Sequence, residues 1–212
     1  MTRIAVLGGT GYAGRHIVAE AVKRGHTVLS VARSIPNERV EGANYVEGTL
    51  LDVPGLAAEL EGVEVLVCAI AARGDMLGMV RPNVAALLSV LPDSVRVGVI
   101  GGAGGSLVAE GGPRLIDSGF PDEFKPEAEE AIGILDELQA DASGRDWFFV
   151  HPAGGFGAWA PGERTGSYRT GGDVLVTDAD GESFISGADL GVAVVDEIEN
   201  PAHHRARFTV GY

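Results

Sequence analysis

A run of glycines close to the start of the chain is the strongest chemical signal in the sequence. Residues 8–14 read GGTGYAG, which fits both GxxGxxG and GxGxxG. Glycine at this spacing allows a tight turn, a close approach of a phosphate to the backbone, and close packing of a helix on a strand. The amides and dipole of a helix that starts here favour an anion. The run therefore predicts a turn that binds the pyrophosphate of a dinucleotide. The residues expected to contact it are Gly8, Thr10, Gly11, Tyr12, Ala13 and Gly14.

The residues after the second predicted strand bear on which dinucleotide is bound. An NAD-dependent protein offers Asp or Glu to the ribose hydroxyls about 20 residues after the glycines. This chain has Arg33 and Ser34 there instead. A guanidinium forms charge-assisted hydrogen bonds with a phosphate, and the serine hydroxyl can add another. The pair favours NADP(H) over NAD(H), the alternative being that Arg33 is a solvated surface residue.

Further cofactor contacts are expected at the ends of the third to fifth predicted strands. Asp52, which Val53 follows, could accept a hydrogen bond from the adenine amino group or simply cap the next helix. Small residues after the fourth strand would let a ribose lie close to the sheet, although they are equally typical of a core. The nicotinamide is expected beside the glycines that follow the fifth strand. The additional candidates are thus Ala69, Ile70, Ala71 and Gly101.

Candidates for the reacting end of the site lie further along the chain. His151 follows the sixth predicted strand and is the candidate proton donor, because imidazole titrates near neutral pH. The alternative is a histidine that closes a strand end with its hydrogen bonds satisfied. Ser106 could bind the carboxamide or the substrate, or be a turn serine. Phe156 and Trp159 are candidates for stacking on an aromatic acceptor, or for packing within their loop, and Arg164 for binding an acceptor's phosphate or carboxylate.

The elements that must position these residues alternate along the first 150 residues. Apolar, strand-like runs occupy 3–7, 27–32, 44–46, 64–70, 95–100 and 147–150. Helical patterns occupy 11–24, 54–60, 76–91 and 126–140. Alternation of this kind predicts a parallel sheet with helices on both faces. We expect an α/β fold, a Rossmann-like doubly wound parallel sheet with a small C-terminal cap.

The pattern changes after the sixth predicted strand. Residues 152–172 are rich in glycine and contain two prolines, which predicts a long ordered loop. Short strands are expected at 174–176 and 184–186, a helix at 187–199 and a last strand at 208–210. We expect residues 1–212 to form one domain, in which 151–186 is a loop-rich lid over the cofactor cleft.

The composition is that of a globular protein and excludes several classes of partner. The chain has 212 residues, of which 45% are hydrophobic and 22% charged. Sixteen basic and 30 acidic residues give a net charge of −14, which repels nucleic acid and anionic membranes. A single cysteine, Cys68, excludes an internal disulfide, and no Cys or His cluster indicates a metal site. Without a secretory signal or a long apolar run, a cytoplasmic location is expected.

Several of these motifs resemble those of a known family. The glycine turn, the Arg33-Ser34 pair and the Asp52-Val53 step are similar to those of the atypical short-chain dehydrogenase/reductases, in the NmrA-like NAD(P)H-binding family. The segments at 161–166, 172–173, 177–181 and 207–212 make the chain most similar to the NADH-flavin reductases related to biliverdin-IXβ/flavin reductase. The resemblance spans essentially the whole chain and implies a Rossmann-like fold that binds NAD(P)H.

One departure from the common short-chain dehydrogenases bears on the reaction. Those enzymes use a Tyr with a Lys four residues later, whereas the residues four before Lys23 and Lys125 are Ala19 and Pro121. Carbonyl–alcohol chemistry by that route is therefore not expected. Reduction of an aromatic acceptor does not require a Tyr/Lys pair, because the cofactor carries the hydride and the protein only orients the reactants. The sequence thus favours hydride transfer from NADPH to a flavin, quinone or similar aromatic acceptor, in which case a flavin is one candidate substrate.

Two other functions remain open at this stage. A non-catalytic, NmrA-like regulator that senses NADP(H) would share the glycine turn and would also lack the Tyr/Lys pair. A nucleotide-sugar epimerase or dehydratase is disfavoured by the missing pair and by the short C-terminal part. The sequence does not give the oligomeric state, although an exposed helix at 126–140 could pair two copies into a homodimer.

Overall fold

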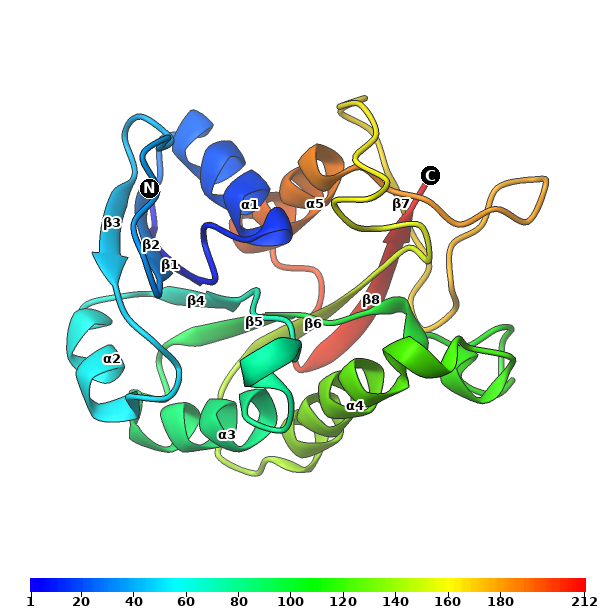
Figure 1. Cartoon of the computed structure of the whole chain (residues 1–212), viewed down its shortest axis with the longest axis horizontal. Coiled ribbons are helices and arrows are strands. Elements are labelled where there is room, and N and C mark those ends of the chain that lie inside the picture. The colour runs from blue at the N-terminus through cyan, green and yellow to red at the C-terminus, as the bar shows by residue number, and fades with distance from the viewer.

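The computed structural model describes residues 1–212 and builds them around one eight-stranded sheet (Figure 1). The strand order is β3-β2-β1-β4-β5-β6-β8-β7, and every neighbouring pair is parallel except β7 with β8. The strands are β1 (Arg3–Leu7), β2 (Thr27–Ala32), β3 (Asn44–Glu47), β4 (Val65–Cys68), β5 (Arg96–Ile100), β6 (Trp147–Pro152), β7 (Arg169–Thr170) and β8 (Ala206–Gly211).

Helices cover both faces of the sheet. Figure 1 shows α1 and α5 on one side and α2, α3 and α4 on the other. The helices are α1 (Tyr12–Lys23), α2 (Val53–Glu59), α3 (Val80–Val90), α4 (Lys125–Ala140) and α5 (Gly187–Glu199). Short 3₁₀ turns lie between them, η1 at Gly74–Met76 and η2 at Ala103–Gly105 among them. The predicted Rossmann-like, doubly wound fold is confirmed.

The core lies in two layers because successive residues of a strand point to opposite faces. In β1, Ile4 and Val6 pack toward α1 and α5, whereas Ala5 and Leu7 pack toward α2, α3 and α4. All four side chains are at most 1% exposed. A strand buried on both faces needs apolar residues at every position, which is why the central strands are continuous hydrophobic runs.

The order of the strands creates a crevice at one edge of the sheet. From β1 the chain moves outward through β2 and β3, and then returns to the other side of β1 with β4. Ligands of open α/β sheets bind at this switch point, beyond the carboxyl ends of the strands. Because β1 to β6 are parallel, the loops that carry the candidate site residues all emerge at that edge.

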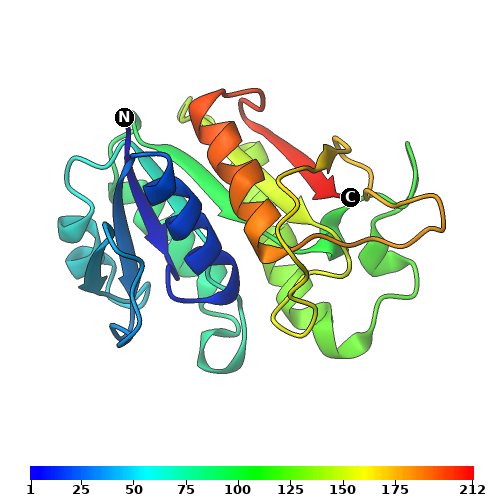
Figure 2. The same cartoon turned by 90° about the horizontal axis from the view of Figure 1, so that it is seen from above.

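The C-terminal part differs from the sequence-based expectation in detail. The segments 174–176 and 184–186 are not strands, since they form only single bridges to Leu107 and Gly155. Their apolar residues Val176 and Ile185 are buried by packing, without a neighbouring strand to pair with. β8 continues the main sheet in parallel beside β6, and α5 packs on α1. Figure 2 shows the loop after β6 running beside α5.

Two further details concern the helices. The helix expected from residue 76 begins at Val80, after the turn η1, and Pro82 lies in its first turn, where a missing amide does no harm. None of the helices combines the length and the apolar character needed to cross a lipid bilayer.

Candidate functional site

The glycine turn between β1 and α1 has no room for side chains at two positions. Gly8 has a φ of +75°, and a Cβ on it would lie 2.7 Å from the carbonyl oxygen of Ala69. A Cβ on Gly14 would lie 2.1 Å from the carbonyl oxygen of Gly8. The amide of Gly11 donates to that same oxygen at 2.9 Å and closes the turn. The sequence folds this way because only glycine permits both the backbone angle and the close approach.

The start of α1 offers backbone amides to a ligand. Gly11 precedes the helix without a side-chain cap, and its first turn has no acidic residue. The backbone hydrogen bonds of the turn are donated by Gly8, Gly9 and Gly11, which leaves the amides of Thr10, Tyr12 and Ala13 unpaired with backbone. These three residues line a cleft. Free amides at the positive end of a helix dipole fit a pyrophosphate group.

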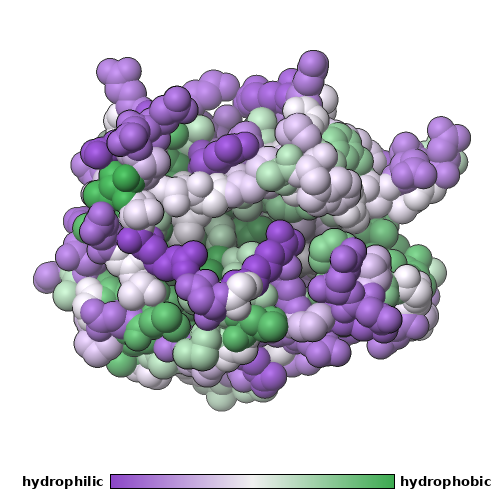
Figure 3. All heavy atoms as spheres, in the orientation of Figure 1, coloured by the Kyte–Doolittle hydropathy of each residue, from purple (hydrophilic) through white to green (hydrophobic).

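The cleft has a volume of about 730 Å³, within the range of cofactor and ligand sites. Figure 3 shows it as a hollow with pale and green atoms between hydrophilic rims. The order of the strands determines which residues line each part of the cleft. Arg33 and Thr49 follow β2 and β3 at one end, the glycine turn follows β1 near the middle, and Phe156 and Trp159 follow β6 at the other end. We call the end with Arg33 and Thr49 the adenosine end and the end with Phe156 and Trp159 the acceptor end, after the groups that the sequence analysis expects there.

Most of the predicted cofactor contacts lie together in this cleft. The predicted residues that line it are Gly8, Thr10, Gly11, Tyr12, Ala13, Arg33, Ala69, Ile70, Ala71 and Gly101. Gly14 lies beneath the turn, where it packs against the backbone of Gly8 and Gly9. The sequence motif therefore identified both the lining of the cleft and the backbone contact that shapes it.

Besides Gly14, three predicted cofactor residues do not line the cleft. Asp52 caps α2, accepting a hydrogen bond from the amide of Gly55 at 3.2 Å, which is the alternative considered above. Val53 begins that helix and packs against the core, and Ser34 is exposed outside the cleft. These residues do follow β2 and β3, as the sequence analysis expected. The local turns, however, direct their side chains away from the cleft.

The two proposed catalytic residues are buried away from the cleft. His151 is 1% exposed and does not line it, and its Nδ1 donates to the carbonyl oxygen of Gly102 at 2.8 Å. Burial lowers the pKa of His151 to about 4, so the ring is neutral at neutral pH and a poor proton donor. Ser106 is fully buried, its hydroxyl has no partner, and it does not line the cleft either. The prediction that His151 donates a proton is therefore wrong. The histidine lies within β6, and only its Nδ1 has a hydrogen-bond partner, because its Nε2 is buried without one.

The burial of His151 predicts a specific loss of stability in acid. The unfolded chain binds a proton near pH 6.5 and the folded chain only near pH 4, so stability falls as the pH drops from 6.5 toward 4. Relative to His151→Gln, the wild type should lose about 2 kcal/mol of unfolding free energy between pH 7 and pH 5. Urea denaturation at both pH values measures this difference. The control is His204→Gln, whose side chain is 64% exposed in the wild type. A pH dependence that His151→Gln shares with the wild type would contradict a buried neutral ring.

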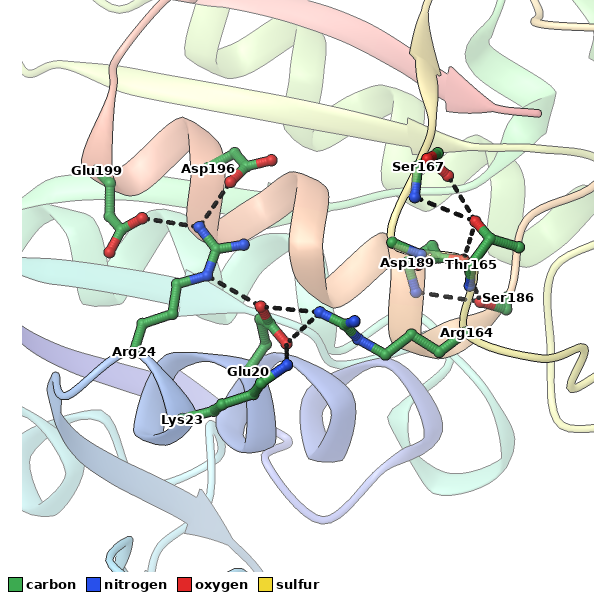
Figure 4. Close-up of polar contacts among 11 residues, drawn as sticks. Glu20, Lys23, Arg24, Arg164, Thr165, Ser167, Ser186, Asp189, Asp196 and Glu199 are labelled. Carbon is green, nitrogen blue, oxygen red and sulfur yellow. Dashed lines mark hydrogen bonds and ion pairs between the residues drawn. The ribbon is translucent and has the colours of Figure 1, made fainter.

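The proposed acceptor residues divide into two groups. Phe156 and Trp159 line the cleft, with the ring of Phe156 centred 5.2 Å from that of Tyr12. Trp159 remains 72% exposed, so one side of it is open to a ligand. Arg164 lies outside the cleft and forms an ion pair with Glu20 at 3.1 Å (Figure 4). The side chain of Glu20 is only 8% exposed and needs cationic partners, which explains why Arg164 is directed there.

Hydrogen bonds fasten the loop after β6 to the fold, and the sequence analysis missed the main acceptor among them, Asp189. Asp189, in the first turn of α5, accepts hydrogen bonds from the amides of Thr165 and Gly166 at 2.8 Å each (Figure 4). The hydroxyl of Tyr12 donates to the carbonyl oxygen of Pro161 and accepts from the amide of Gly187. A signal for Asp189 was present, because it stands three residues after Ser186 in a capping pattern.

Sequence comparison now identifies the family. A family model described as NAD(P)H-binding matches residues 8–201, which is most of the chain. The chain belongs to this NAD(P)H-binding family. The match includes the glycine turn and the residues that line the cleft on both sides of it, and it confirms the resemblance to the NmrA-like, atypical short-chain dehydrogenase/reductases.

Relatives of this NAD(P)H-binding chain match it over nearly its full length. The uncharacterized protein YwnB of Bacillus subtilis (strain 168) is 35% identical over 212 residues, which cover 98% of this chain and 97% of YwnB. SP1627 of Streptococcus pneumoniae TIGR4, described as a "putative NADH-flavin reductase", is 33% identical with a TM-score of 0.89, covering 100% and 99% of the two chains. A Bacteroides thetaiotaomicron structure, described as a "putative epimerase", is 29% identical with a TM-score of 0.86 over 100% and 97%.

Proposed function

We propose that the chain is a reductase that passes a hydride from NADPH to a flavin, a quinone or a similar flat aromatic molecule. The observation that carries this proposal is the continuity of the cleft, which joins an anion-binding turn to an apolar end. One similar structure supports the same reaction, since SP1627 is described as a "putative NADH-flavin reductase". The nicotinamide, when bound, supplies the hydride, and the protein supplies orientation and shelter from water.

Each part of the cleft has a role in this proposal. The amides of Thr10, Tyr12 and Ala13 would hold the pyrophosphate, and Arg33 would hold the 2′-phosphate that distinguishes NADPH from NADH. The small residues after β4 and β5 leave space for the ribose and the nicotinamide. At the acceptor end, Phe156 and Trp159 would stack on the acceptor and limit the access of water.

The charged groups of the cleft favour an acceptor that needs no proton from the protein. Glu130 lines the cleft but accepts hydrogen bonds from the amides of Gly78 and Arg81, at the start of α3. Glu127 is paired with Arg73. With both carboxylates engaged and no Tyr/Lys pair in the sequence, a flavin or quinone whose reduced form takes its proton from solvent fits this site better than an isolated ketone or aldehyde.

Mixing the protein with NADPH and either FMN or menadione tests this proposal. We expect oxidation of NADPH that saturates with acceptor and exceeds the rate without protein. Trp159→Ala should raise the KM for the acceptor by about tenfold, because it removes an aromatic contact, and should leave NADPH affinity unchanged. Val90→Ala serves as the control, since Val90 is exposed at the end of α3 and does not line the cleft.

Bound NADPH without oxidation by any acceptor would contradict the reductase proposal. That outcome favours the second candidate, a regulator that senses NADP(H) without turning it over. The burial of His151 and Ser106 is the observation that supports this candidate, because neither proposed catalytic side chain reaches the cleft.

A further inference from the structure

Both arginines that line the cleft are already paired with carboxylates. Arg33 forms an ion pair with Asp75, and Arg73 forms one with Glu127. A phosphate that binds at either arginine must therefore compete with a carboxylate of the protein. The pair at Arg33 bears directly on the proposed function, because Arg33 is the residue expected to bind the 2′-phosphate.

The Arg33–Asp75 pair joins two loops that lie on either side of β1. Arg33 follows β2, whereas Asp75 lies in η1, after β4. Because β2 and β4 flank β1 in the sheet, the pair spans the carboxyl end of β1 at the adenosine end of the cleft. Met76, the neighbour of Asp75, lines the cleft together with Thr49 and Leu50. Asp75 thus lies within reach of a group that binds at Arg33.

We propose that Asp75 is a specificity-determining residue that lowers the affinity of the site for NADP(H). This inference rests on the proposed binding of the dinucleotide. The carboxylate of Asp75 and a 2′-phosphate compete for one guanidinium, and a displaced carboxylate would remain close enough to repel the phosphate. Toward NAD(H) the same carboxylate is favourable, because an acidic side chain near the ribose can accept hydrogen bonds from its hydroxyls.

Asp75 supplies the acidic group that the sequence lacks after β2. In an NAD-binding protein that group follows the second strand directly, whereas here it comes from a loop 42 residues further on. The ion pair is open to competition, since the side chains of Arg33 and Asp75 are 60% and 66% exposed. The side chain of Asp75 makes no other hydrogen bond, so its role in the fold is small.

Calorimetric titration of Asp75→Asn with NADP⁺, NAD⁺ and adenosine 2′,5′-bisphosphate tests this inference without any need for turnover. We expect NADP⁺ and the bisphosphate to bind Asp75→Asn about three- to tenfold more tightly than they bind the wild type, because the variant removes one charge that competes with the 2′-phosphate. NAD⁺ should bind equally well or up to about threefold more weakly, because it loses only a hydrogen-bond acceptor.

Two further variants separate a local effect from a general change of charge. Asp136→Asn removes a carboxylate from another exposed ion pair, with Arg114, that lies outside this cleft. It should leave the affinity for both coenzymes within about twofold of the wild type. In an Arg33→Met background, the gain in NADP⁺ affinity from Asp75→Asn should shrink, because no guanidinium is left to release.

The outcomes distinguish this inference from the proposed function. If Asp75→Asn changes the ratio of NADP⁺ to NAD⁺ affinity no more than Asp136→Asn does, the role of Asp75 is overturned and the proposed function stands. If the wild type binds neither coenzyme, the proposed function fails, and the inference fails with it.

Discussion

Replacing Gly14 with alanine should reduce the affinity for NADP⁺ by at least about 100-fold, a loss of about 2.7 kcal/mol. The added Cβ would lie 2.1 Å from the carbonyl oxygen of Gly8 and 2.8 Å from the Cα of Gly9. Both neighbours are backbone atoms that cannot rotate away, so the turn must open and its amides must move from the pyrophosphate site. Calorimetric titration with NADP⁺ measures the loss of affinity.

A matched variant on the same helix controls for a loss of helix stability. Ala19 is exposed on α1, and Ala19→Gly should cost about 1 kcal/mol of helix stability without touching the turn. This variant should bind NADP⁺ as the wild type does. Binding of unchanged affinity by Gly14→Ala would show that the glycine turn does not hold the dinucleotide.

Replacing Asp189 with alanine should lower the free energy of unfolding by about 3–5 kcal/mol at pH 7. Asp189 is fully buried and accepts hydrogen bonds from Thr165, Gly166 and Tyr212. Removing the carboxylate leaves the amides of Thr165 and Gly166 without a partner and releases the loop after β6 from α5. Urea denaturation, followed by circular dichroism, measures the change. Asp180→Asn, in an exposed loop, is the control and should be close to neutral.

The contribution of Asp189 should also depend on pH with a definite sign. Burial opposes the charged form, but hydrogen bonds from Tyr212, Thr165 and Gly166 outweigh it and lower the pKa of Asp189 below its usual 3.8. A carboxyl group with a lowered pKa stabilises the fold above pH 3.8 and loses that contribution as the pH falls further. The difference in the free energy of unfolding between the wild type and Asp189→Ala should therefore become smaller in strong acid. A difference below about 1 kcal/mol at pH 7 would contradict the proposed anchoring role.

The parts of the site that could be predicted are those whose constraints are local. In the glycine turn, the positive φ of Gly8, the contact of Gly14 with Gly8, and the start of α1 all fall within seven consecutive residues. The buried strands were also predictable, because a parallel strand covered on both faces shows as a continuous apolar run. Helix α5 matched its predicted bounds, 187–199, because its apolar periodicity ends at a clear boundary.

The parts that could not be predicted depend on contacts between distant residues or on the direction of one side chain. Arg164 pairs with a carboxylate 144 residues away in sequence, and Asp75 pairs with an arginine 42 residues away. No local sequence pattern can therefore predict either contact. His151 was expected just after the sixth strand, whereas β6 extends to Pro152 and includes it. Whether its ring points toward the cleft or into the core depends on the packing of Gly105 and the carbonyl of Gly102, which the sequence does not reveal.

Calorimetric titration of the wild-type chain with NADPH tests the central claim most directly, namely that the turn after β1 holds the diphosphate of a nicotinamide dinucleotide. We predict saturable binding to one site per chain, which Ala19→Gly retains and Gly14→Ala loses. Absence of binding heat with both NADPH and NADH, at several temperatures, would contradict this account.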